Sequence, residues 1–88
     1  MKEKQIAAVA NVLAQWNPLG AAARNVPDLD GYRTEAMDII FGFRMRGRSV
    51  SAERIVMEVL NQAFDLALDA QSCIDPTKEI VAILGKKR

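Results

Sequence analysis

The amino-acid sequence predicts an all-α fold: a small antiparallel four-helix bundle with a long connector between the first two helices. Apolar residues recur at intervals of three and four along four separate segments, as on the buried face of a helix. Residue types that start and stop helices separate these segments. No stretch shows the alternation of apolar and polar residues that a half-buried strand requires. With 88 residues we expect one helical domain over 1–88, in which 85–88 form a frayed tail.

The first helix is predicted over residues 4–16. Its buried face consists of Ile6, Val9, Ala10, Leu13 and Trp16. Pro18 ends this helix, because the residue before a proline is displaced from the helical region. The connector then covers 17–31. Fifteen residues without regular structure are many for so small a domain, so we expect a short helical turn over 19–24.

The second helix is predicted over residues 32–46. Asp30 is its expected N-cap, and Gly47 its expected stop in the left-handed region. The main apolar face consists of Tyr32, Ala36, Ile39, Ile40 and Phe43. Met37 and Phe41 widen this face, and Met45 is interpreted as a packing residue.

The third helix is predicted over residues 52–70, where apolar residues repeat most regularly, and Ser51 is its expected cap. The fourth helix is expected to open at Asp75, a capping residue followed by Pro76 at the first helical position. Gly85 is expected to close it.

The composition argues against several classes of enzyme. The chain has no histidine, which removes the commonest general base and the Ser-His-Asp arrangement. Cys73 is the only cysteine, so no cysteine zinc cluster can form, and the five glycines match no nucleotide-binding loop. Glu35 and Asp38 are interpreted as part of a solvated helix face rather than a catalytic pair. We therefore expect a protein that is not an enzyme, without catalytic residues, metal or cofactor.

The sequence also bears on location. No run of about 18 consecutive apolar residues is present, and no signal-peptide core follows the charged N-terminus. A single cysteine fits a reducing compartment, since small secreted domains usually depend on disulfides. We expect a cytoplasmic protein that does not enter a membrane.

Four arginines form the one notable charge cluster, a candidate nucleic-acid patch: Arg44, Arg46, Arg48 and Arg54. Phosphate or RNA contact is one interpretation of this patch. Against it, the patch lacks interleaved aromatic residues, and the net charge of the chain is only +1. A solvated or internally salt-bridged surface is the interpretation that we favour, so nucleic acid is not the expected partner.

The connector carries a resemblance to a known family. The segment Trp16-Asn17-Pro18-Leu19-Gly20 resembles the Trp-Asp-Pro-Leu-Gly signature of the YugE-like small bacterial proteins, from which Asn17 departs. The segment Tyr32-Arg33-Thr34-Glu35-Ala36 is similar to the Tyr-x-x-Glu-Ala start of the following helix in that family. The resemblance implies a small helical bundle and brings no established activity.

Two roles stay open for the connector. In the structural role, Trp16 packs in the bundle while Asn17 caps the next turn. In the binding role, this loop presents Asn17, Arg24 and Tyr32 to a partner. The leading hypothesis for the whole chain is a non-catalytic accessory or interaction module that binds another protein, and homo-oligomers are compatible with it. The alternative is weak nucleic-acid binding through the arginine patch.

Overall fold

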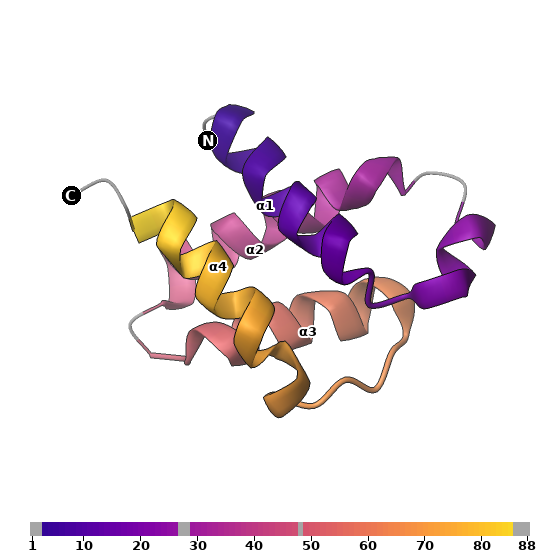
Figure 1. The fold of residues 1–88 in the computed structure, drawn as a ribbon. Coiled ribbons are helices and arrows are strands. Elements are labelled where there is room, and N and C mark those ends of the chain that lie inside the picture. The colour runs from indigo at the N-terminus through magenta and orange to yellow at the C-terminus, as the bar shows by residue number, and fades with distance from the viewer. Residues whose placement is uncertain (1–2, 27–28, 48, 86–88) are drawn as a thin grey trace.

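The computed structural model describes residues 3–26, 29–47 and 49–85. Its helices are α1 (Glu3–Trp16), α2 (Arg33–Arg46), α3 (Ala52–Phe64) and α4 (Ile74–Gly85). Three short 3₁₀ turns accompany them, at Gly20–Asn25, Asp30–Tyr32 and Gln71–Cys73. No strand occurs in these ranges, so the predicted all-helical fold is confirmed (Figure 1). Residues 86–88 of the expected tail lie outside the described ranges.

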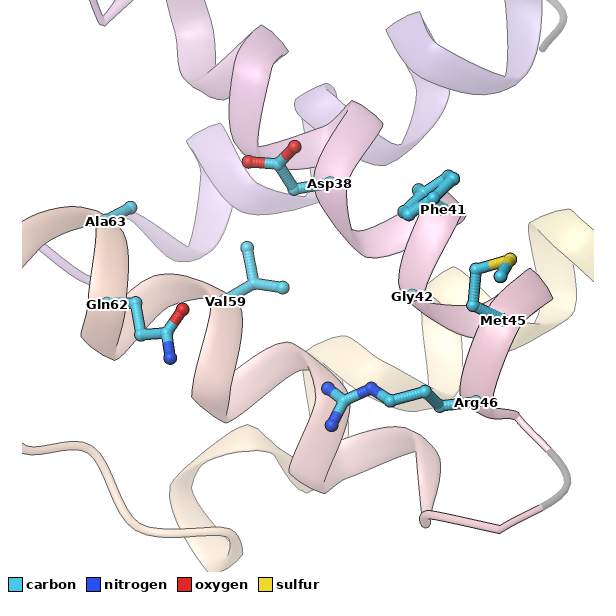
Figure 2. A pocket seen from close by; sticks show the side chains of 8 residues that line it. All are labelled: Asp38, Phe41, Gly42, Met45, Arg46, Val59, Gln62 and Ala63. Carbon is cyan, nitrogen blue, oxygen red and sulfur yellow. The ribbon is translucent and has the colours of Figure 1, made fainter.

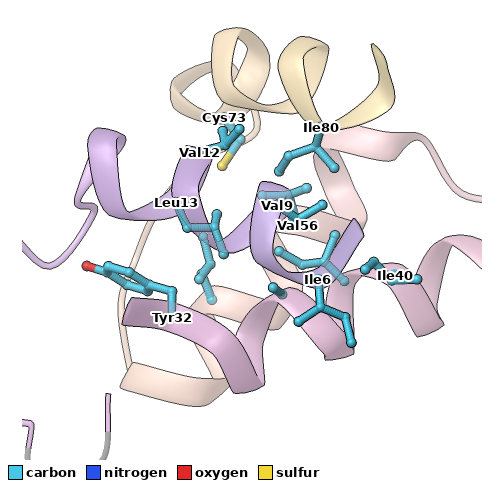
Figure 3. Close-up of a cluster of buried hydrophobic side chains, with 12 residues drawn as sticks. Ile6, Val9, Val12, Leu13, Tyr32, Ile40, Val56, Cys73 and Ile80 are labelled. Atoms are coloured by element: carbon cyan, nitrogen blue, oxygen red, sulfur yellow. The ribbon is translucent and has the colours of Figure 1, made fainter. Parts of the chain in front are cut away.

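The four helices share one hydrophobic core (Figure 3). α1 packs against α2 and α4, and α3 contacts both α2 and α4. The core residues come from every helix: Ile6, Val9, Val12 and Leu13 of α1, Ala36, Ile39 and Ile40 of α2, Val56 and Leu60 of α3, and Ile80 of α4, together with Tyr32 and Cys73. The main apolar face of each helix therefore points inward, as predicted.

A glycine lets α2 and α3 approach closely. A Cβ atom at Gly42 would lie 2.8 Å from Cγ2 of Ile55, which is fully buried. Real Cβ atoms do not come this close to a neighbour. Gly42 thus lowers the intrinsic helix stability of α2 and in return permits tight packing on α3.

The start of α2 differs from the prediction. Asp30, Gly31 and Tyr32 have φ angles of 46°, 63° and 67°, so three successive residues turn in the left-handed region. The helix begins only at Arg33, and no side-chain hydrogen bond caps it. Asp30 is therefore not the N-cap, because the left-handed turn separates it from the first helical residue.

The end of α2 also differs. Gly47 has φ −61° and ψ −18°, in the right-handed region. Its backbone N–H still donates to the carbonyl of Phe43, at 3.0 Å. The predicted left-handed stop at Gly47 is wrong, because Gly47 keeps the right-handed geometry of the helix.

The predicted third helix is too long. It ends at Phe64, because Asp65 adopts the left-handed region with φ 55°. The side-chain amide of Asn61 then binds both backbone groups of Leu68: Oδ1 accepts from its N–H at 2.9 Å, and Nδ2 donates to its carbonyl at 3.1 Å. Leu68 still packs on the core, now from a non-helical segment.

The caps of α3 and α4 also differ from the prediction. Ser51 occupies the N-cap position of α3, but its hydroxyl makes no capping bond. Before α4, the carboxylate of Asp69 accepts from the backbone N–H of Ser72 at 2.9 Å and from its hydroxyl at 2.7 Å. The resulting 3₁₀ turn leads directly into α4 at Ile74. The chain therefore becomes helical before Asp75, which lies in the first turn of α4, and Gly85 is its last residue.

Candidate functional site

The connector is fastened to the core through the hydroxyl of Tyr32. This hydroxyl donates to Oδ1 of Asn17 at 2.7 Å and accepts from the backbone N–H of Leu19 at 3.3 Å. Asn17 also donates through Nδ2 to the carbonyl of Gly20, at 3.2 Å. Tyr32 is only 2% exposed, and its ring packs edge-on against Phe64, with the ring centroids 6.0 Å apart. Tyr32 therefore exposes almost no surface that a partner could contact. Its hydrogen bonds instead attach the connector to the core.

The three candidate partner-binding residues of the connector lie in different environments. The structure joins Asn17 and Tyr32 by a hydrogen bond. Arg24 lies exposed in the 3₁₀ turn, and none of the hydrogen bonds or ion pairs found in the described residues joins it to the other two. Trp16 is half-buried against the core. These positions favour the structural role for Asn17 and Tyr32 and leave Arg24 as the exposed member.

Two arginines of the candidate nucleic-acid patch are engaged within the molecule. Nη2 of Arg46 lies 2.8 Å from Oε1 of Glu58, and Nε of Arg54 lies 3.2 Å from Oε2 of the same carboxylate. Hydrogen bonds first from Arg46 and then from Arg54 hold the pKa of Glu58 below its ordinary value. Arg44 is exposed, and Arg48 lies outside the described residues. The Glu58 carboxylate thus offsets part of the charge that a phosphate would meet.

An apolar groove lies along the outer side of α2 and α3 (Figure 2). Two large apolar side chains of α2 line this groove and are more than half exposed to solvent, Phe41 at 56% and Met45 at 66%. Its lining residues are Asp38, Phe41, Gly42, Met45 and Arg46 of α2, with Val59, Gln62 and Ala63 of α3. The groove encloses about 550 Å³. We refer to this surface as the α2–α3 groove.

The expectation that Phe41 and Met45 serve internal packing is wrong. The second helix carries apolar residues on two sides, and the core takes the side of Ala36, Ile39 and Ile40. Phe41 and Met45 are four residues apart and therefore share the other side of the helix, as Figure 2 shows. This spacing was the available signal for the groove, but the sequence places Phe41 and Met45 beside the main apolar face, which does lie in the core, and so favoured internal packing for them.

Glu35 is buried, so its interpretation as part of a solvated face is wrong. It is 8% exposed, and its Oε1 has no hydrogen-bond partner within the described residues. Burial raises the pKa of Glu35, and the nearby charge of Asp38 adds to this rise. Asp38 itself is exposed on the α2–α3 groove, which Glu35 does not line. The two carboxyl groups thus do not share a cleft.

The Cys73 thiol and the acidic side chains of the described residues give little support for a catalytic or metal-binding role. Burial raises the pKa of the Cys73 thiol, and a thiol with a raised pKa is a weak nucleophile. Across the described ranges, no group of three His, Cys, Asp or Glu side chains could hold a metal ion. Within those same ranges, every helix is too short or too polar to cross a lipid bilayer.

Comparisons with protein-family models, curated proteins and solved structures find no match to this chain. Membership of the YugE-like proteins therefore stays a prediction, which depends on the residues of the connector and the start of α2.

Proposed function

We propose that this protein is a non-catalytic interaction module that binds another protein through the α2–α3 groove. The observation that carries the proposal is the exposure of Phe41 and Met45, more than half of each side chain. Removing one large apolar side chain from water contributes about 1.5–3 kcal/mol. Binding energy at protein interfaces is concentrated in a few such anchors.

The shape of the groove supports a helical segment as the bound element. Phe41 and Met45 lie one helical turn apart on α2, and Ala63 of α3, which has a small side chain, lines the same groove. An amphipathic helix binds such a groove with apolar residues at intervals of three and four. The polar groups of Asp38, Gln62 and Arg46 line the same groove and fit a polar rim.

We further propose that the module is an antiparallel four-helix bundle in the cytoplasm. We also propose that it is related to the YugE-like small bacterial proteins through the 16–20 and 32–36 segments. In this proposal the connector is structural, since Tyr32 and Asn17 bind each other. The contacts of Arg46 and Arg54 with Glu58 disfavour nucleic acid as the ligand, because they engage two of the four patch arginines within the molecule.

Affinity capture with matched variants tests the proposal. Tagged wild-type protein is compared with the Phe41→Ser, Met45→Ser double variant. The control is Ile74→Ser, Val81→Ser, which removes two apolar side chains of α4 that are 37% and 44% exposed. We expect the same partner to be retained by wild type and control and lost from the groove variant, while circular dichroism shows the same helix content in all three. Retention of that partner by the groove variant would contradict the proposal.

A further inference from the structure

Two opposite charges flank the exposed apolar residues of the α2–α3 groove. Asp38 and Arg46 are eight residues apart on α2, about 12 Å along the helix axis, with Phe41 and Met45 between them. Gly42 lies midway. A helix that binds here antiparallel to α2 therefore needs a basic residue opposite Asp38 and, eight residues away, an acidic residue opposite Arg46.

The α2 helix itself has this arrangement. When a second copy is turned by a twofold rotation near Gly42, its Arg46 faces Asp38 and its Asp38 faces Arg46, with both pairs of apolar anchors between them. A twofold interface has this self-complementary form, in which residue i meets residue j and j meets i. We propose that the occupant of the α2–α3 groove in the free protein is a second copy of this chain, so that the protein is an antiparallel homodimer.

Arg46 can bind the Asp38 carboxylate of a second copy while it keeps its ion pair with Glu58. Its side chain is 44% exposed, and the ion pair with Glu58 uses Nη2. A guanidinium group carries five N–H donors, so a carboxylate from another copy can bind beside Glu58. None of the described basic residues forms an ion pair with Asp38.

The area that such a dimer needs is compatible with the size of the molecule. A specific interface buries about 800 Å² on each partner, about one seventh of the 5683 Å² accessible surface of this chain. The groove spans two helices and contains the two most exposed large apolar side chains of the described residues. It is therefore a suitable centre for an interface of that size.

This inference rests on the proposed function for its choice of surface, and it adds a regulatory consequence. A second copy in the groove covers Phe41 and Met45, so self-association competes with the binding of another protein. The two proposals fail separately, because sedimentation of the pure protein reports the dimer and affinity capture reports the other partner.

Sedimentation equilibrium of the full chain, at about 10 to 500 µM, tests the dimer. We expect twice the mass of one chain for wild type and for the Ile74→Ser, Val81→Ser control. The Phe41→Ser, Met45→Ser variant should associate at least about 30-fold more weakly, because each anchor is lost twice in a twofold interface. A monomeric wild type, or a groove variant that dimerises as well as wild type, would overturn the proposal. A monomer whose groove captures another protein's helix would overturn it in favour of that occupant.

A charge exchange tests the antiparallel arrangement. Asp38→Arg and Arg46→Asp should each weaken association at least about tenfold, because each creates two like-charge contacts. The double variant restores opposite charges and should associate within about threefold of wild type. Glu58→Gln is the control for loss of the internal ion pair of Arg46, and should stay dimeric. A double variant as weak as the single ones would overturn the arrangement.

Discussion

Tyr32 is the residue that joins the connector to the helices. Its φ of 67° is unusual for a large side chain, and such a conformation persists only where the surrounding contacts hold it. Here the ring is buried against Phe64, and the hydroxyl bonds both Asn17 and the backbone of Leu19. The 3₁₀ turn of the connector therefore depends on a residue of the second helix segment rather than on its own sequence.

Removal of the Tyr32 hydroxyl should weaken the fold. Tyr32→Phe keeps the ring and leaves the Asn17 and Leu19 groups without this partner, so we expect a loss of about 1–2 kcal/mol in the free energy of unfolding. Asn17→Asp is the comparison, because it keeps the acceptor for Tyr32 and exchanges the exposed donor to Gly20 for a carboxylate oxygen; its loss should be smaller, because that bond is exposed to solvent. Urea denaturation measures both. An unchanged midpoint for Tyr32→Phe would refute the bracing role.

Glu35 should make stability depend on pH. Burial raises its pKa in the folded protein above the value in the unfolded chain. The folded protein then binds the proton more tightly, so stability falls as pH rises from the unfolded value through the folded value. The ionised form of Glu35, which predominates above the raised pKa, is therefore the destabilising one.

Glu35→Gln tests this effect. We expect it to raise the melting temperature by several degrees at pH 7 and by much less below about pH 4, where the wild-type carboxyl is neutral as well. Glu79→Gln, at an exposed position of α4, is the control and should change little at either pH. A Glu35→Gln gain that is equal at both pH values would show that charge is not its cause.

At the scale of the element, the contact between α2 and α3 is set by one glycine. Alanine at Gly42 would improve helix propensity by about 1 kcal/mol, but its Cβ would lie 2.8 Å from Ile55. Overpacking of this kind typically has a larger effect, so we expect Gly42→Ala to reduce stability by about 1–3 kcal/mol. Chemical denaturation measures the change, and Gly85→Ala is the control, because open space surrounds Gly85. A stabilising Gly42→Ala would refute the close approach.

The number of helices and their inward faces could be predicted from the sequence, because both follow from periodicity. The turn at Gly20–Asn25 could also be predicted, from the length of the connector. The end of α3 could not, because the apolar spacing continues past Asp65 while the chain turns there and Asn61 binds Leu68. Side-chain hydrogen bonds between residues seven positions apart leave no periodic signal.

At the scale of the whole molecule, the groove could not be predicted because packing between helices leaves no periodic signal in the sequence. The sequence shows that Phe41 and Met45 share a side of the second helix, but only the packing of α1 and α3 on α2 shows that this second apolar side stays uncovered. The arginine cluster was easier to interpret. Its lack of aromatic residues and the near-neutral chain favoured internal ion pairs, and Glu58 provides them for Arg46 and Arg54.

We propose that the α2–α3 groove, rather than the connector, is the surface that binds a protein. Amide NMR of the labelled chain, with and without its captured partner, tests it most directly. We expect the largest shift changes on residues 38–46 and 58–63, while those of 17–25, around Arg24, stay small. Large changes confined to 17–25, with the groove unaffected, would contradict it.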